Sequence, residues 1–173
     1  PLAFIAKHDL NKEIAKTFSK VWSDYTNSSV SAIKLFFPEI INLINSHINT
    51  PAFALRRTIA LTIIEIIDVL DIRINELNPG HLAELYKILL ESLDGRIYDG
   101  KEKLLDSLVN LACKSSSFLS KNDELYQRVE ERVVFEANRK NKQYQKFSVL
   151  ALGKLLSVYH EKDSLYDQYV NLV

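Results

Sequence analysis

The sequence predicts an all-α protein in which pairs of helices repeat along the chain. Apolar residues recur at helical spacing through nearly all of the 173 residues, and no segment alternates with the period of a strand. Only four glycines and four prolines interrupt the pattern, as expected for helices joined by short turns. The helical segments also recur at a nearly constant distance, which indicates repetition of one unit.

The first two helices follow from the apolar spacing and from one capping signal. Apolar residues at positions three and four apart predict a first helix over residues 10–25. Ser28 or Ser29 can accept a hydrogen bond from the first turn of the next helix, which is expected to run to about residue 48. Pro38 lies inside that segment and predicts a kink or a break into two pieces.

Proline and glycine set the bounds of the next two helices. Thr50-Pro51 has the order of a helix cap followed by proline at the first helical position, so a third helix is expected from there to about Leu70. Asn78-Pro79-Gly80 predicts a turn, and a fourth helix follows it. Asp94-Gly95 is expected to end that helix, because glycine is favoured where the last residue is left-handed.

Four further helices are expected over residues 98–118, 122–138 and 141–160 and from about Asp163. The whole chain is therefore interpreted as one block of repeats. The expected helix pairs are 10–48, 51–93, 98–138 and 141–173.

The internal repetition of the sequence predicts which kind of all-α fold the chain adopts. A shift of 45 residues places the third helix on the fifth and the fifth on the seventh, and the basic residues Arg56, Lys101 and Lys146 coincide. The intervening helices align at a shift of 44. Helix pairs that recur every 40–47 residues are typical of HEAT and armadillo arrays. One helix pair cannot bury its apolar face alone, whereas stacked pairs form a continuous core, so we expect an α-α superhelix.

Composition excludes several classes of function. The 22 basic residues balance the 22 acidic ones, so no net field attracts nucleic acid or an acidic membrane. The most apolar stretch is too short and too charged for a transmembrane helix, and a soluble protein without membrane insertion is expected. The chain contains no methionine and stops inside an apolar pattern, which we interpret as a fragment of a longer solenoid.

The strongest signal for a small-molecule site is the segment Gly95–Glu102. It matches the phosphate-binding pattern G-x-x-x-x-G-K, but Glu102 stands where serine or threonine would ligate magnesium. No buried strand precedes it, so a tight turn between helices is the preferred interpretation. The four histidines lie far apart without metal-ligand spacing, and Cys113 sits in an apolar helix without a base. We therefore expect no enzyme, cofactor, metal or small-molecule substrate.

One motif of this chain resembles a known family. The stretch Gly95-Arg96-Ile97-Tyr98-Asp99-Gly100-Lys101-Glu102, with the leucines on both sides of it, is similar to the large proteasome adaptor and scaffold family. Tyr98 stands where tryptophan is more usual in that family, and Ile97 where threonine is. Weaker similarities extend over most of the chain, among them Ala6-Lys7-His8-Asp9 and Gln143-Tyr144-Gln145-Lys146-Phe147. The chain resembles a late portion of the full solenoid.

This resemblance implies a non-enzymatic scaffold that associates with the 26S proteasome. It implies that core and regulatory particle subunits are the partners, that the protein tethers them and supports proteasome assembly or quality control, and that it works in cytoplasm and nucleus. A HEAT scaffold of another kind, such as a transport receptor or a phosphatase scaffold subunit, remains the alternative. The residues expected to be exposed partner contacts are Arg56, Arg57, Arg96, Tyr98, Lys101, Arg139 and Lys140.

Overall fold

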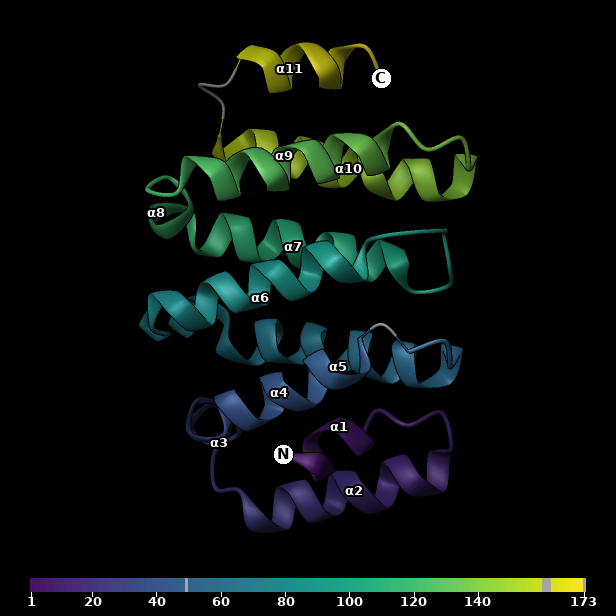
Figure 1. The fold of residues 1–173 in the computed structure, drawn as a ribbon, viewed down its shortest axis with the longest axis vertical. Helices are drawn as coiled ribbons and strands as arrows, with labels where there is room; N and C mark the ends of the chain where they lie inside the picture. The colour runs from purple at the N-terminus through teal and green to yellow at the C-terminus, as the bar shows by residue number, and fades with distance from the viewer. Residues whose placement is uncertain (49, 160–162, 173) are drawn as a thin grey trace. The chain divides into compact units, whose positions relative to one another are not determined.

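The computed structural model describes residues 1–48, 50–159 and 163–172, and these residues form helices without a strand among them (Figure 1). The all-α helical-repeat fold predicted from the sequence is confirmed. The chain divides into two compact units, Pro1–Ser92 and Leu93–Val173. The expectation of one continuous block of repeats stays a prediction.

The first unit contains six α-helices and one 3-10 helix within its described residues. Helix α1 packs against α2, α4 and α5, and α5 also packs against α3 and α4. Helix α4 contacts α6 as well. The elements are α1 (Leu2–Ala6), α2 (Lys12–Tyr25), α3 (Ser29–Leu35), α4 (Phe37–His47), α5 (Phe53–Leu70), η1 (Asp71–Glu76) and α6 (Pro79–Ser92).

The second unit is built around α10, which packs against α7, α9 and α11. Apolar side chains from α7, α9 and α10 form its core, and Leu104, Leu108, Val129, Val133 and Leu152 are fully buried. The elements are α7 (Lys101–Lys114), α8 (Ser116–Leu119), α9 (Asp123–Ala137), α10 (Lys142–Val158) and α11 (Asp163–Val170).

Several helix boundaries confirm the capping signals. Ser28 accepts a hydrogen bond at its hydroxyl from the backbone N–H of Ser31, over 3.4 Å, and so caps α3. The break expected at Pro38 is present, since α3 ends at Leu35 and α4 begins at Phe37 with the proline in its first turn. Gly95 is left-handed, with φ of 81°, as expected for the residue that turns the chain after α6.

Two proline signals were interpreted wrongly. Pro51 does not open a helix, because α5 begins at Phe53 and Thr50 instead accepts a hydrogen bond from the N–H of Ala52. Pro79 is not part of a turn but the first residue of α6. The side chain of Asn78 accepts a hydrogen bond of 2.8 Å from the N–H of His81, so it caps this helix.

Helix α1 was not predicted, and it is held to α5 by ionic and hydrogen-bonding contacts. Lys7 Nζ lies 2.6 Å from Oε1 of Glu65, and His8 Nε2 lies 2.7 Å from Oε2 of the same carboxylate. The hydroxyl of Thr58 donates to the carbonyl of His8 over 3.2 Å. Five residues are too few for a stable isolated helix, so these contacts stabilise α1 together with the burial of Phe4.

The pKa of Glu65 is lowered below its ordinary value of 4.5. Burial alone would raise it, but hydrogen bonds and charge from His8 and Lys7 outweigh that effect. Because the folded pKa is depressed, the contribution of Glu65 to stability is fully present above pH 4.5 and is lost as pH falls through the folded pKa. The contacts between α1 and α5 are therefore sensitive to acid.

We expect Glu65→Gln to lower the free energy of unfolding by about 1 kcal/mol at pH 7, since it removes the charged acceptor of Lys7 and His8. The difference from the unmodified protein should shrink as the pH falls below 4.5 and vanish once the pH is below the folded pKa of Glu65. Trp22 is the only tryptophan and its ring lies 4.8 Å from that of Phe4, so its fluorescence during urea unfolding reports on this region. Glu39→Gln, at an exposed position, is the control. Equal pH dependence for both variants would contradict the assignment.

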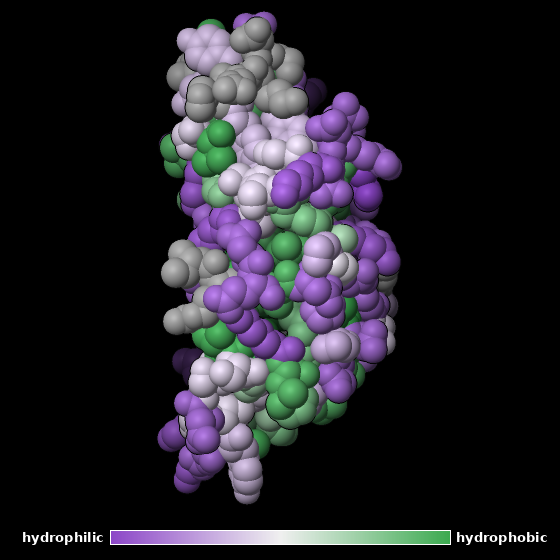
Figure 2. All heavy atoms as spheres, turned by 90° about the vertical axis from the view of Figure 1, so that its left-hand side faces the viewer, coloured by the Kyte–Doolittle hydropathy of each residue, from purple (hydrophilic) through white to green (hydrophobic). Residues whose placement is uncertain are grey.

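Hydrophobic side chains remain on the surface of both units. Figure 2 shows one face of the molecule, where hydrophobic side chains lie among hydrophilic ones. Leu35, Leu150, Tyr25, Phe135 and Phe147 are each at least half exposed. No helix of the described part of the chain is both long and apolar enough to cross a membrane.

Candidate functional site

The segment that carries the family-like motif forms the connection from α6 to α7. Two glycines shape it: Gly95 and Gly100 have φ of 81° and 97°, values that other residues adopt only under strain. The carboxylate of Glu102 accepts a hydrogen bond of 3.2 Å from the N–H of Gly100, which satisfies one of the free donors at the start of α7. The spacing of the two glycines and Glu102 therefore has a local structural reason.

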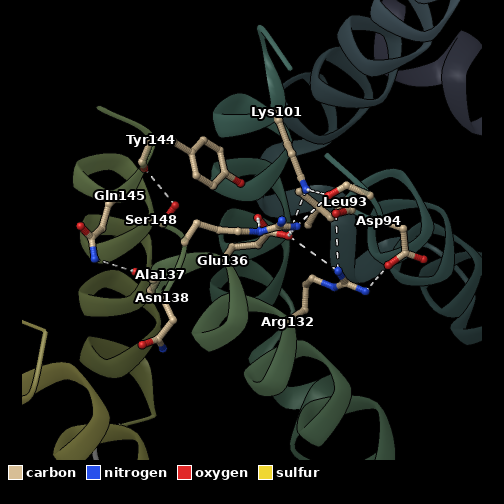
Figure 3. A network of polar contacts seen from close by, with 12 residues as sticks. Leu93, Asp94, Lys101, Arg132, Glu136, Ala137, Asn138, Tyr144, Gln145 and Ser148 are labelled. Atoms are coloured by element: carbon tan, nitrogen blue, oxygen red, sulfur yellow. Dashed lines mark hydrogen bonds and ion pairs between the residues drawn. The ribbon is translucent and has the colours of Figure 1, made fainter. Parts of the chain in front are cut away.

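Lys101 is fully buried, and the expectation that it is an exposed partner contact is wrong. Its ammonium lies 3.1 Å from Oε1 of Glu136 in α9, which is also fully buried, and it donates to the carbonyl of Gly95 over 3.2 Å (Figure 3). Burial lowers the pKa of Lys101, and the charge of Glu136 opposes that shift. The side chain joins the start of α7 to the end of α9.

Glu136 is surrounded by three cationic groups. Besides Lys101, Arg132 Nη1 lies 3.7 Å from its carboxylate, and Arg139 reaches both oxygens at 3.2 Å. Burial of a charge costs several kcal/mol unless partners compensate it. Here the compensation comes from Lys101 on α7 and from the two arginines, which lie one helical turn away on each side of Glu136. Tyr144 also faces this carboxylate. The pKa of the Tyr144 hydroxyl is raised mainly by burial and to a smaller extent by Glu136.

The two arginines also bind the connection before α7. Arg132 pairs with the carboxylate of Asp94 and donates to the carbonyl of Leu93 over 3.5 Å. Arg139 donates to the carbonyl of Gly95 over 2.7 Å. Residues 93–95 are thus fixed to the C-terminal end of α9 through the carbonyls of Leu93 and Gly95 and the carboxylate of Asp94. We call the group Asp94, Lys101, Arg132, Glu136 and Arg139 the buried-charge network.

This geometry differs from that of a phosphate-binding loop. Such a loop directs its backbone N–H groups and its lysine toward the phosphates. Here the lysine points to Glu136, the N–H of Gly100 is bonded to Glu102, and the carbonyl of Gly95 accepts from both Lys101 and Arg139. The interpretation as a tight connection between helices accounts for these contacts.

Cys113 and Tyr159 have raised pKa values. Burial raises the pKa of the Cys113 thiol, which lowers the population of its reactive thiolate. The hydroxyl of Tyr159 donates to the carbonyl of Ala112, and burial raises the pKa of this tyrosine to about 12. No group of three or more metal-ligating side chains comes together in the part of the chain that the structure describes.

The other predicted contact residues fall into two places. Arg96 and Lys140 are exposed in the second unit, beside Gly95 and Arg139 respectively, and Tyr98 is half-buried in the same connection. Arg56 and Arg57 lie in the first unit near the start of α5, both partly buried, and Arg56 donates to the carbonyl of Thr50 over 3.3 Å. Whether they contact a partner stays a prediction.

Three residues of this region were missed from the sequence. Glu136, Arg132 and Phe135 lie on α9 and were not among the residues expected to be partner contacts. The spacing of Arg132, Glu136 and Arg139, four and three residues apart, is a detectable signal, since such residues are neighbours on a helix. Nothing in their spacing indicates the burial of Glu136, because that depends on Lys101, which is 35 positions away.

Comparisons with known proteins give the family context. Residues 112–173 match the family model described as ECM29, C-terminal ARM-like repeats. Proteasome component ECM29 of Saccharomyces cerevisiae is 29% identical over 95% of this chain and 9% of its own length. Proteasome adapter and scaffold protein ECM29 of Homo sapiens is 22% identical over 100% of the chain and 10% of its own length.

A second yeast protein, Proteasome component ecm29 of Schizosaccharomyces pombe, is 27% identical over 99% of the chain and 10% of its own length. This chain therefore spans about a tenth of the relatives that it matches. No solved structure matches. The resemblance to the large proteasome adaptor and scaffold family is confirmed, and the chain is similar along its length to a late portion of the ECM29 proteins.

Proposed function

We propose that this chain is a section of a non-enzymatic scaffold that binds the 26S proteasome. The observation that carries the proposal is the similarity of 95% or more of the chain to proteins named proteasome components or a proteasome adapter and scaffold. The helical-repeat fold supports it, because arrays of helix pairs expose extended surfaces suited to protein partners. The buried-charge network supports it too, since its polar groups bond to one another instead of forming a reactive site.

The proposal extends to what the scaffold does. Contact with both the core and the regulatory particle would tether the two and support assembly or quality control of the proteasome. Two binding sites on one scaffold raise the local concentration of the second partner, so modest contacts suffice for stable association. The cytoplasm and the nucleus are the proposed locations. Binding of nucleic acid is not proposed, given the balance of 22 basic and 22 acidic residues.

Affinity purification tests this function. The full-length protein that contains this chain, carrying a tag, is expected to recover subunits of both the core and the regulatory particle from a cell lysate, quantified by mass spectrometry against the tag alone. Recovery without proteasome subunits would overturn the proteasome assignment. A transport receptor or phosphatase scaffold would recover its own partners in the same experiment.

A further inference from the structure

The connection from α6 to α7 contains two Asp-Gly sequences, Asp94-Gly95 and Asp99-Gly100. Both aspartates are exposed, with 65% of the Asp94 side chain open to solvent. A Cβ added at either glycine would meet none of the described residues within 4 Å, apart from its chain neighbours. Asp-Gly is the sequence in which a protein chain rearranges most readily, because glycine has no side chain to hinder its own nitrogen. The connection thus contains two chemically reactive positions.

The rearrangement releases one water molecule and takes one up. The main-chain nitrogen of glycine attacks Cγ of the preceding aspartic acid, and its proton leaves as water together with one carboxyl oxygen and the carboxyl proton. The cyclic imide that results then adds water at one of its two carbonyls. Opening at the main-chain carbonyl leaves the chain linked through Cγ, which is isoaspartate. The ring closes only when the glycine nitrogen eclipses Cβ of the aspartate, since both belong to the planar imide.

The turn at Asp99-Gly100 holds the glycine nitrogen away from that position. Lys101 donates its N–H to the carbonyl of Tyr98 over 3.1 Å, and Gly100 has φ of 97° and ψ of −6°. Among the described residues other than glycine only Asp71 has a positive φ, so φ of Asp99 is negative. These values define a type II turn, in which ψ of Asp99 is about 120° and the Gly100 nitrogen is rotated away from Cβ. Ring closure requires this peptide to turn over.

Glu102 fixes the peptide between Asp99 and Gly100 in its present orientation. The carboxylate accepts a hydrogen bond of 3.2 Å from the N–H of Gly100, and this nitrogen is the one that attacks during ring closure. Turning the peptide over breaks the bond, and a hydrogen bond to a charged acceptor is stronger than one between neutral groups. Glu102 therefore raises the barrier to ring closure at Asp99.

At Asp94-Gly95 the carboxyl group itself is held. The Asp94 carboxylate pairs with the guanidinium of Arg132, which also donates to the carbonyl of Leu93 over 3.5 Å (Figure 3). On the other side, the carbonyl of Gly95 accepts from Arg139 over 2.7 Å. The carboxyl carbon must leave Arg132 before it can reach the Gly95 nitrogen, and carbonyl contacts hold the backbone on both sides. Arg132 therefore opposes ring closure at Asp94.

We propose that Asp94 and Asp99 are latent sites of isoaspartate formation, and that Arg132 and Glu102 each keep one of them unreactive. Isoaspartate at position 99 would add a methylene to the main chain two residues before Lys101, which belongs to the buried-charge network. No binding partner takes part in this chemistry, so its outcome is independent of the proposed function.

Incubation of the full-length protein at pH 7 and physiological temperature, followed by trypsin digestion and mass spectrometry, measures both reactions. Trypsin places Asp94 and Asp99 in different peptides, residues 88–96 and 97–101. Electron-transfer fragmentation distinguishes isoaspartate from aspartate in each of them. In the folded protein we expect each site to react at least about tenfold more slowly than in the corresponding synthetic peptide. An equal rate in protein and peptide at either site would overturn the proposal.

Two substitutions separate the two protecting groups. Glu102→Ala removes the acceptor of the Gly100 N–H and is expected to speed the reaction at Asp99 at least about tenfold, with little change at Asp94. Arg132→Ala is expected to speed the reaction at Asp94 and to leave Asp99 nearly unchanged. Glu102→Gln keeps an acceptor oxygen and should retain most of the protection. An equal increase at both sites in either variant would indicate general opening of the connection and overturn the proposal.

Matched controls and added salt complete the test. Glu131→Ala and Arg128→Ala remove the same kinds of side chain at exposed positions of α9 and should leave both rates unchanged. Circular dichroism verifies that each variant retains its helices. Salt screens the exposed ion pair of Asp94 with Arg132 without any substitution, so the rate at Asp94 should rise relative to that at Asp99. A ratio that does not change with salt would contradict the role of Arg132.

Discussion

Replacement of Glu136 by alanine is expected to lower the free energy of unfolding by about 3–5 kcal/mol, because it leaves charges buried without a counter-ion. Lys101, which is fully buried, loses its carboxylate partner, and Arg132 and Arg139 lose one of their acceptors. Urea unfolding followed by circular dichroism at pH 7 measures the change. Hydrogen exchange should show that protection is lost first around residues 93–105 and 130–146.

The double variant Lys101→Met with Glu136→Leu tests whether the loss of stability comes from uncompensated charge. Removing both charges leaves no uncompensated ion at the centre of the network, so this variant should recover a large part of the loss. Lys101→Met alone should cost less than Glu136→Ala, since Glu136 keeps two arginines. Destabilisation of under 1 kcal/mol by Glu136→Ala would show that the carboxylate is hydrated or protonated and not part of a buried ion pair.

Leu105→Ala is expected to cost about 2–5 kcal/mol, whereas Leu150→Ala should change the free energy of unfolding by no more than about 0.5 kcal/mol. The two leucines are equivalent in the 45-residue repeat, but Leu105 is fully buried and Leu150 is 71% exposed. Truncation of the fully buried Leu105 leaves a cavity, and truncation of the exposed Leu150 leaves none. The same denaturation experiment compares them.

The matched pair makes the outcome decisive. Both substitutions delete the same atoms from the same position of the repeat, so differences of helix propensity between leucine and alanine cancel. Equal costs for the two variants would contradict the burial seen at Leu105. They would show that the repeat register, and not the neighbouring helices, determines the contribution of this position.

The regular part of the fold could be predicted from the sequence because it depends on local periodicity. The spacing of apolar residues located α2, α4, α5, α9 and α10 to within a few residues, and Ser28 and Pro38 acted as expected. The short α1 escaped prediction because five residues carry no periodic pattern and its stability comes from Glu65, nearly 60 positions away. The spacing of apolar residues within a short segment cannot indicate contacts with residues so far away in the sequence.

The buried-charge network shows the same limit at the candidate site. Arg56, Lys101 and Lys146 share one position of the repeat, yet they are respectively partly buried, fully buried and exposed. Periodicity gives the same environment to all three. What distinguishes Lys101 is a carboxylate supplied by α9, together with a connection whose carbonyl at Gly95 turns toward the ammonium. The motif could be identified from the sequence. Its structural role in joining helices could be recognised only from the fold.

Binding of the purified full-length protein to purified proteasome particles tests the central claim most directly. Interferometry with the core particle, the regulatory particle and the assembled 26S complex gives three dissociation constants. The scaffold account predicts measurable binding to each particle and at least about tenfold tighter binding to the assembled complex, because both contacts then form on one scaffold. No saturable binding to any of the three would contradict it.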